Sequence, residues 1–407
     1  HYNLSLPTLT TQLFVYVGGM FIACMVCHGE LYRLKPATTH LTKFYLSISL
    51  GGAMGGVFVT FVAPQLFSDY WEFPLAFIFV FVLGIWLVLF SPTRAPALLN
   101  YRKPAVALAL LVLTGLLTCQ FMIVERFHEG VLATKRNFYG VLRVLEDDAG
   151  TDRHRYKLYH GGINHGIQSR VDADEFQPMS YYAEHSGAGI AFRRHPIRLA
   201  QREGSTQGLH VGIIGLGAGA LGAYQNEYDT FRYYELNPDV ETLARDYFTY
   251  LEHGDNRVEV ILGDARISME RELQNEGSQN YDILIVDAFS GDAIPIHLLT
   301  TEAFELYQQH LKPDGILAIH ISNKFFDLRP LIYGTSEHFQ MQPRLIVRRK
   351  DSSELIKRST WGLLTKNEAF LNHSRVKAYV RDWPEDIEEH KAIWTDDSAN
   401  VLSLIKD

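Results

Sequence analysis

Three carboxylates and a group of glycines carry the chemistry that this sequence suggests. Each carboxylate ends or follows a short apolar run of the kind that forms a buried strand: Glu235, Asp264 and Asp287. The apolar run at 210–214 is followed instead by Gly215, Gly217 and Gly219. Glycines permit a positive φ and let a ligand approach the backbone closely. A carboxylate can hold the hydroxyls of a ribose, or bind an ammonium group and accept its proton.

The glycine turn by itself is a weak signal, because it fits NAD, FAD and S-adenosyl ligands equally well. The three acids narrow the choice towards a site for a nucleoside together with a cationic group. Two plainer readings remain beside this one. The glycines could serve only tight packing between a strand and a helix, and Asp264 could be the N-cap of a helix that begins at Ala265.

The elements that position these residues alternate between strand and helix from about residue 205 to 325. Short connections between them predict a doubly wound, mainly parallel, Rossmann-like α/β sheet. In open sheets of this kind, ligands bind at the carboxyl ends of the strands. We therefore expect the glycine turn and the three acids to lie along one edge of the sheet.

A smaller β region precedes this sheet. The segments 137–146 and 155–160 alternate in polarity as strands do, and 161–166 supplies turn residues, among which we place His165. We expect a β-hairpin subdomain with a linker over 125–185. The α/β domain then follows over 186–407.

The first 124 residues have the composition of membrane-spanning segments. Runs without a charged side chain cover 1–29, 44–68, 73–93 and 104–124, and each is at least as long as the roughly 20 residues that span a bilayer. This predicts an N-terminal transmembrane domain of about four helices over 1–124, and a lipid bilayer as a partner. Since the chain starts at His1, further spans could precede it.

Charge divides the chain unevenly. The formal net charge is −8, with +3 in residues 1–124 and −11 in the remainder. An acidic soluble part argues against nucleic acid as a partner, because that partner demands basic surface. An intracellular nucleoside ligand would place the soluble part in the cytoplasm, on the inner face of a bacterial-type inner membrane. A homodimer is compatible with the sequence.

Residues from about 136 to 407 resemble the spermidine synthase (polyamine aminopropyltransferase) family, and most of all its membrane-fused branch. The segment 158–168 corresponds to the family motif D-G-x-x-Q, and Tyr182-Ala-Glu184 is similar to its Y-x-E. Asp287 matches the first acid of the loop D-S-S-D-P. The resemblance implies the class I S-adenosylmethionine methyltransferase fold for the catalytic domain.

The resemblance also implies roles for individual residues. Cofactor-binding residues would be Gln168, Gly215, Gly217, Gly219, Glu235, Asp264 and Ala265. Glu235 would bind the ribose, and Asp264 with Ala265 would lie beside the adenine. Asp287 would be the general base, because a primary amine is protonated at neutral pH and cannot attack until it loses a proton. The sulfonium donor is already activated, so we expect no metal.

Further residues could contact the substrate. They are Tyr181, Tyr182, Asp292, Asp396 and Asp397. The tyrosines could line the site and make cation–π contacts with a bound cation. The three acids could pair with ammonium groups of a polyamine. Turn or cap roles for the acids, a core role for one tyrosine and a hairpin role for Gln168 are the plainer alternatives.

Three departures from the family bear on the substrate. The acid that the family carries in the glycine loop is Ala218 here, Asp287 and Asp292 are five residues apart instead of three, and the histidine that often follows the substrate tyrosine is Ala183. The predicted function is a membrane-anchored transfer of an aminopropyl group from decarboxylated S-adenosylmethionine to an amine such as putrescine. The alternatives are a methyltransferase or other enzyme that uses S-adenosylmethionine, and a non-catalytic domain that senses a nucleoside or polyamine.

Overall fold

The computed structural model describes residues 9–90, 104, 107, 110, 111, 114, 130–253, 257–288, 295–349 and 355–406. The chain divides into two compact units, one of residues 1–129 with 136–138 and one of residues 130–135 with 139–407. The second unit includes both the α/β sheet and most of the smaller β region. The predicted boundaries at 124/125 and 185/186 stay predictions.

The N-terminal unit is helical over its described part. It contains α1 (Leu9–Arg33), α2 (Leu41–Val57), a π-helical segment (Phe58–Val62), α3 (Ala63–Leu66) and α4 (Glu72–Phe90). One continuous helix of 29 residues, Thr38–Leu66, is long and apolar enough to cross a bilayer, and its most apolar 18-residue stretch has a mean hydropathy of 1.8. A shorter apolar helix covers Glu72–Leu87.

The prediction of about four membrane helices is therefore corrected to one candidate among the described residues. The expected spans at 1–29 and 73–93 have helical counterparts, but in the described residues these do not reach the combined length and hydropathy of a span. Most of the segment 104–124 lies outside the described residues.

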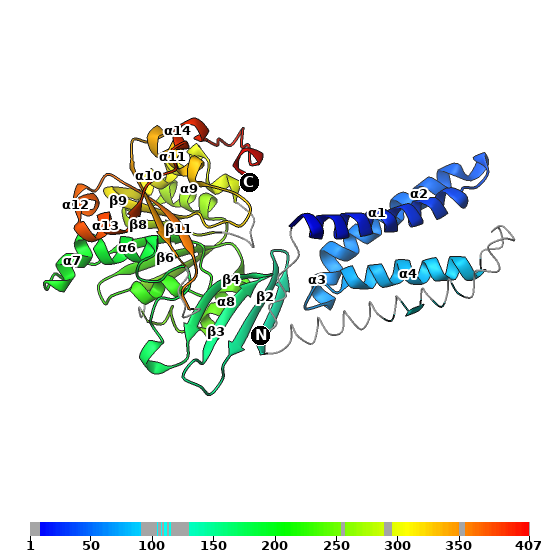
Figure 1. Ribbon diagram of the computed structural model, residues 1–407, viewed down its shortest axis with the longest axis horizontal. Coiled ribbons are helices and arrows are strands. Elements are labelled where there is room, and N and C mark those ends of the chain that lie inside the picture. The colour runs from blue at the N-terminus through cyan, green and yellow to red at the C-terminus, as the bar shows by residue number, and fades with distance from the viewer. Residues whose placement is uncertain are drawn as a thin grey trace. The chain divides into compact units, whose positions relative to one another are not determined.

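A four-stranded antiparallel sheet opens the second part of the chain, in the order β1-β2-β3-β4 (Figure 1). Its strands are β1 (Val131–Asn137), β2 (Gly140–Asp147), β3 (Arg155–His160) and β4 (Ile163–Ser169). The turn at Gly161–Gly162 connects β3 to β4 as expected. His165 lies inside β4, however, so its assignment to the turn was wrong: the turn needs only two residues, and the chain re-enters the sheet at Ile163.

The main sheet has eight strands in the order β12-β10-β11-β9-β8-β5-β6-β7. The parallel strands are β5 (His210–Ile214), β6 (Thr230–Glu235), β7 (Val258–Leu262), β8 (Tyr281–Val286) and β9 (Leu311–His320). Antiparallel pairing adds β11 (Ser359–Thr365), β10 (Gln342–Arg348) and β12 (Val380–Arg381). The predicted mixed α/β architecture with a mainly parallel sheet is confirmed.

Side chains on alternate strand positions enter two separate cores, which is why these runs are apolar throughout. Ile283 and Ile285 of β8 pack in one core with α6 (Gly187–Arg194) and α8 (Pro238–Tyr247). Leu284 and Val286 pack on the other face with α9 (Ala265–Asn275), α10 (Thr301–His310) and α11 (Arg329–His338). Helices therefore cover both faces of the sheet, as in a doubly wound fold.

The remaining helices are short and lie after α6 or near the C-terminus. They are α7 (Pro196–Arg202), α12 (Glu368–Asn372), α13 (Ser374–Tyr379) and α14 (Ile387–His390). The strand order reverses beside β5, since the chain runs outward through β6 and β7 and then returns to β8 on the other side. A crevice forms at such a switch point, and ligands bind there.

Candidate functional site

The glycine loop leaves β5 at this switch point. Gly215 has φ +98° and Gly217 has φ +54°, which side-chain-bearing residues rarely adopt. A Cβ on Gly215 would lie 2.3 Å from the carbonyl oxygen of Asp287, and one on Gly217 would lie 2.4 Å from the carbonyl oxygen of His165. The loop is therefore wedged between β8 and the small sheet. Gly219 follows at the start of a short 3₁₀ helix, Ala220–Tyr224.

Glu235 ends β6 and turns its carboxylate onto this loop. Oε2 accepts the backbone N–H of Leu216 at 3.0 Å, and Oε1 accepts the N–H of Asn237 at 2.8 Å. Burial raises the pKa of Glu235 above its ordinary value, although these backbone bonds oppose that rise. Each carboxylate oxygen can accept one more hydrogen bond, which is what a ribose diol would donate.

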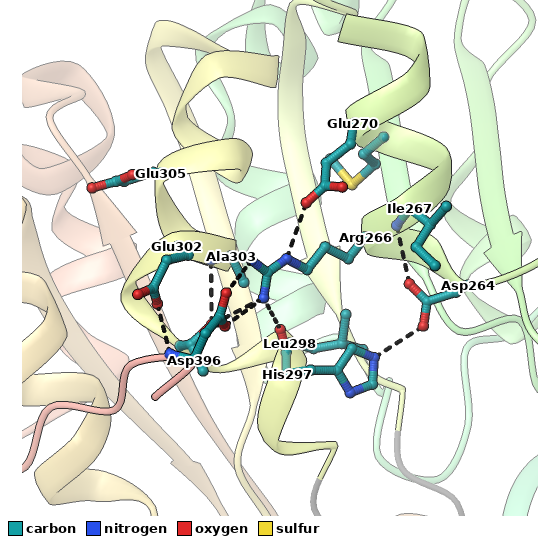
Figure 2. Close-up of polar contacts among 12 residues, drawn as sticks. Asp264, Arg266, Ile267, Glu270, His297, Leu298, Glu302, Ala303, Glu305 and Asp396 are labelled. Carbon is teal, nitrogen blue, oxygen red and sulfur yellow. Dashed lines mark hydrogen bonds and ion pairs between the residues drawn. The ribbon is translucent and has the colours of Figure 1, made fainter. Parts of the chain in front are cut away.

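Asp264 caps the N-terminus of α9. Its Oδ1 accepts the N–H of Ile267 at 3.0 Å, and its Oδ2 lies 3.0 Å from Nε2 of His297 (Figure 2). The N-cap reading of this acid is thus correct in structural terms. It does not remove Asp264 from the site, because Asp264, Ala265 and His297 all line the same cavity.

Asp287 follows β8 and is held by two side chains. The hydroxyl of Tyr182 donates to Oδ2 at 2.6 Å, and Nδ1 of His320 lies 2.7 Å from Oδ1. Burial, and next the Asp287 charge, raise the pKa of Tyr182 well above its ordinary value. The phenol therefore stays protonated and acts as a donor to the carboxylate.

The three acids Glu235, Asp264 and Asp287 line one cavity of about 280 Å³. This volume is close to the lower end of the range for small-molecule sites. Six of the predicted site residues contribute to its wall: Gly215, Gly217, Glu235, Asp264, Ala265 and Asp287. Apolar side chains supply much of the rest, among them Leu142, Leu158, Leu236 and Val240. The cavity thus has an apolar wall, a backbone cradle and separate carboxylates, a combination that suits a nucleoside joined to a cationic chain.

Gln168 is not part of the cavity wall in the described structure. Its Nε2 donates to Oγ1 of Thr249 at 2.6 Å, and its Oε1 accepts the N–H of Thr249 at 3.0 Å. Gln168 is fully buried and ties the small sheet to the loop after α8. These contacts fit the alternative predicted for Gln168, a structural role in the hairpin, and its predicted contact with the cofactor stays a prediction.

Asp396 forms an ion pair with Arg266. Its two oxygens accept Nη1 and Nη2 of Arg266 at 2.7 and 2.6 Å, and Oδ1 also accepts the hydroxyl of Thr300 at 2.8 Å (Figure 2). The Arg266 guanidinium lowers the pKa of Asp396 to about 2. Arg266 further donates to the carbonyl of His297 at 3.1 Å, so this network holds the cavity wall. These contacts fit the alternative role of Asp396 as a turn acid, and contact with a polyamine stays a prediction.

The cavity wall does not include three other predicted substrate residues, Tyr181, Tyr182 and Asp397. Asp397 is exposed in a turn next to Asp396, and Tyr182 reaches the site only through Asp287. Tyr181 packs beside His320, with 5.3 Å between ring centroids. Asp292 lies outside the described residues. Among the described residues there is no cluster of three metal-ligating side chains, and the expectation of no metal stays a prediction.

Four histidines at the site were missed from sequence. His160, His165 and His297 line the cavity, and His320 supports Asp287 from outside the cavity wall. Burial lowers the pKa of His165 to about 4, so its ring is neutral near pH 7. The signal for His320 was its position near the end of the apolar run 315–321, at the same edge as the acids.

Ala218, at the position of the family's loop acid, is fully buried. A Cβ on Gly166 of β4 would lie 2.3 Å from the Cβ of Ala218, so loop and strand touch here. Ala218 is not among the cavity-lining residues. A carboxylate at this position would have no room unless β4 moved.

No family model matches the chain. A polyamine aminopropyltransferase of Vibrio vulnificus is 29% identical over 157 residues, which cover 37% of this chain and 47% of that protein. An N-terminal histidine N-methyltransferase of Emericella nidulans is 32% identical over 109 residues, covering 26% and 19%. A probable polyamine aminopropyl transferase of Bifidobacterium longum is 26% identical over 113 residues, covering 27% and 23%. The chain spans less than half the length of these relatives.

Among solved structures, a probable spermidine synthase from Corynebacterium glutamicum has a TM-score of 0.46 at 17% identity, covering 62% of this chain and 85% of that one. Spermidine synthase from Thermotoga maritima has a TM-score of 0.42 at 17% identity, covering 64% and 82%. The curated relatives include two aminopropyltransferases and a methyltransferase. The sequence similarity to two aminopropyltransferases agrees with the predicted family resemblance. The transferase activity and the membrane-fused branch stay predictions.

Proposed function

We propose that residues 130–407 transfer an aminopropyl group from decarboxylated S-adenosylmethionine to a primary amine such as putrescine. The observation that carries this proposal is that Glu235 and Asp287 line the same cavity, with Gly215 and Gly217 on its wall. One acid is suited to a ribose and the other to an ammonium group. The similarity to aminopropyltransferases favours this reading over the alternatives.

The nucleoside end of the donor would lie against the glycine loop. The backbone at Gly217 allows close approach, and Glu235 would accept the ribose hydroxyls. Leu236 and Val240 would cover one face of the adenine, with Asp264 and His297 at its edge. Gly215 and Gly217 have no room for a Cβ beside the carbonyl oxygens of Asp287 and His165, so bare backbone forms this part of the cavity wall.

Asp287 would act at the reacting end. An amine substrate arrives as an ammonium ion, binds the carboxylate through charge, and gives up one proton to it. The freed nitrogen lone pair then forms a bond to the carbon next to the sulfonium sulfur. The carbon–sulfur bond breaks, its electron pair stays on sulfur, and a neutral thioether leaves. Tyr182 would hold Asp287 in place during this step.

Calorimetric titration with decarboxylated S-adenosylmethionine, S-adenosylmethionine and methylthioadenosine tests this function, followed by mass spectrometry of products with putrescine. We expect tight binding of the decarboxylated donor and an aminopropylated product. Methylation of the amine with S-adenosylmethionine would establish the methyltransferase alternative. Nucleoside binding without turnover of any amine would favour a sensor, and no nucleoside binding would contradict all three.

We further propose that the N-terminal unit anchors the protein in a membrane, with the catalytic unit in the cytoplasm where its donor is made. The apolar helix Thr38–Leu66 supports this, since only 6% of its most apolar 18-residue stretch is buried inside the protein. Alkaline carbonate extraction of membranes that contain the full chain tests the anchor. Release into the soluble fraction would contradict it.

A further inference from the structure

His320 lies directly beside Asp287 because β8 and β9 are parallel neighbours. Val286 pairs with Ile319, so the next residue of each strand, Asp287 and His320, emerges at the same edge. Nδ1 of His320 lies 2.7 Å from Oδ1 of Asp287. His320 is 6% exposed and is not part of the cavity wall, so it acts on the cavity only through the acid.

The hydrogen-bond network around His320 determines which ring nitrogen carries the proton. The backbone N–H of Thr360 donates to Oγ of Ser322 at 2.8 Å, and this Oγ lies 2.8 Å from Nε2 of His320. If Ser322 donates its own hydrogen to Nε2, the ring proton is on Nδ1 and points at the carboxylate. Every donor in the chain from Thr360 to Asp287 then has an acceptor.

The opposite tautomer would place a bare Nδ1 lone pair against an ionised carboxylate oxygen, which is repulsive. It would also require the Ser322 hydroxyl to find another acceptor. The Nδ1–H tautomer therefore satisfies this arrangement best. With Tyr182 donating to Oδ2 at 2.6 Å, one donor meets each oxygen of Asp287.

Aromatic packing fixes the plane of the imidazole. The ring stacks on Trp361, with 4.6 Å between centroids and 19° between planes. Tyr181 lies against it at 5.3 Å. A ring held in this way cannot follow the carboxylate if the carboxylate rotates, so the bond restricts the orientation of Asp287.

We propose that His320 is a positioning residue, held as the Nδ1–H tautomer by Ser322, which keeps the carboxylate of Asp287 aimed at the amine in the cavity. This inference rests on the proposed function. Two fixed donors hold the plane of the carboxylate, while each oxygen keeps capacity for one further bond from an ammonium group. Orientation of a reacting group to within about 1 Å is worth about a hundredfold in rate.

Two substitutions separate this role from simple packing. His320→Phe keeps a ring to stack on Trp361 but removes both nitrogens. His320→Asn loses the ring but places an amide N–H where Nδ1 was. With decarboxylated S-adenosylmethionine and putrescine, we expect kcat to fall about a hundredfold in His320→Phe and only about tenfold in His320→Asn. A packing role predicts the reverse order.

Methylthioadenosine affinity serves as the control in both variants, because His320 does not line the cavity; we expect it to stay within about twofold of the unsubstituted protein. A melting curve identifies any variant that fails to fold. If the Phe variant is as active as the unsubstituted protein, or more active than the Asn variant, the positioning role is wrong.

Nitrogen-15 NMR of the imidazole gives a readout that does not depend on turnover. We expect an Nδ1–H signal from His320 in the unsubstituted full chain, and a mixture of tautomers in Ser322→Ala. An Nε2–H signal in the unsubstituted protein would overturn the inference. Failure of the unsubstituted protein to bind methylthioadenosine would instead contradict the proposed function and leave the tautomer result standing.

Discussion

The carboxylate of Glu235 accepts the backbone N–H of Leu216, with 3.0 Å between Oε2 and N. The acid that ends β6 is therefore bonded to the loop that follows β5. Backbone hydrogen bonds link the ends of β5, β6 and β7 on either side of this contact. Gly215 N–H donates to the carbonyl of Tyr234 at 2.8 Å, and Gly263 N–H donates to the carbonyl of Glu235 at 2.9 Å. Loop and acid form one rigid wall for a ligand.

Replacement of Glu235 should therefore affect binding before it affects catalysis. We expect Glu235→Ala to weaken methylthioadenosine binding by more than tenfold, which is about 1.4 kcal/mol. Asp287→Asn is the matched control, and it should abolish turnover while affinity stays within about tenfold. Calorimetry and steady-state kinetics measure the two effects, and equal losses of affinity in both variants would contradict the separate roles.

The close contact between Gly217 and the carbonyl oxygen of His165 predicts a large loss of unfolding free energy when one methyl group is added at Gly217. Gly217→Ala must adopt φ +54° and also place its Cβ 2.4 Å from the carbonyl oxygen of His165. Gly161→Ala is the control, because Gly161 has φ +56° and nothing within 4 Å of its Cβ. We expect Gly161→Ala to lose about 1 kcal/mol of unfolding free energy, and Gly217→Ala to lose about 1–3 kcal/mol more.

Urea titration of the two glycine variants measures this difference. Equal losses in the two proteins would mean that β4 yields easily to the added methyl group. The tight contact between the loop and β4 would then be wrong.

Burial of Ala218 predicts that an acid cannot simply be restored to the glycine loop. Ala218→Asp would place a carboxylate in a fully buried site packed on Gly166. We expect a loss of several kcal/mol in unfolding free energy, because a buried charge without a partner is strongly unfavourable. Ala218→Gly, which removes only a methyl group, should lose about 1 kcal/mol. A folded Ala218→Asp protein of normal stability would show that the loop tolerates the acid after all.

Buried His195 and half-buried His165 predict that the free energy of unfolding falls in acid. Burial lowers the pKa of His195 to about 4, as it does for His165. Between pH 6.5 and about 4 the unfolded chain binds a proton at each position while the folded chain does not. Their stabilising effect is therefore complete above pH 6.5 and is lost as the pH falls to about 4.

The effect at His195 is at most about 3 kcal/mol, given a shift from 6.5 to about 4. Its Nδ1 also accepts the N–H of Ile197 at the start of α7. His195→Asn keeps an acceptor for this cap but does not titrate, so it should flatten the pH dependence. Chemical unfolding at pH values from 4 to 7 measures how the free energy of unfolding changes with pH. An unchanged pH dependence in the variant would contradict the effect assigned to His195.

The cavity-lining acids could be predicted because their positions are local properties of the sequence. Each acid follows an apolar run, and the carboxyl ends of parallel strands share one edge. That reasoning placed Glu235, Asp264 and Asp287 in the same cavity without knowledge of the strand order.

The partners of the predicted residues could not be read in the same way. Gln168 bonds to Thr249, 81 residues away, and Asp396 bonds to Arg266, 130 residues away. A buried amide or an acid near the C-terminus looks the same in sequence whether it binds a ligand or a distant side chain. Which of the two it does depends on what the fold brings next to it.

Short segments of the chain were enough to predict the kind of sheet, the edge where the cavity lies and the acids found there, because hydrophobic period, glycines and strand ends are local features. Other relations are visible only in the folded chain: His320 supports Asp287, His165 and His297 line the cavity, and Ala218 faces β4. These relations arise from strand order and register, which join segments far apart in the chain. No local pattern specifies that order, since pairing depends on how all the strands pack together.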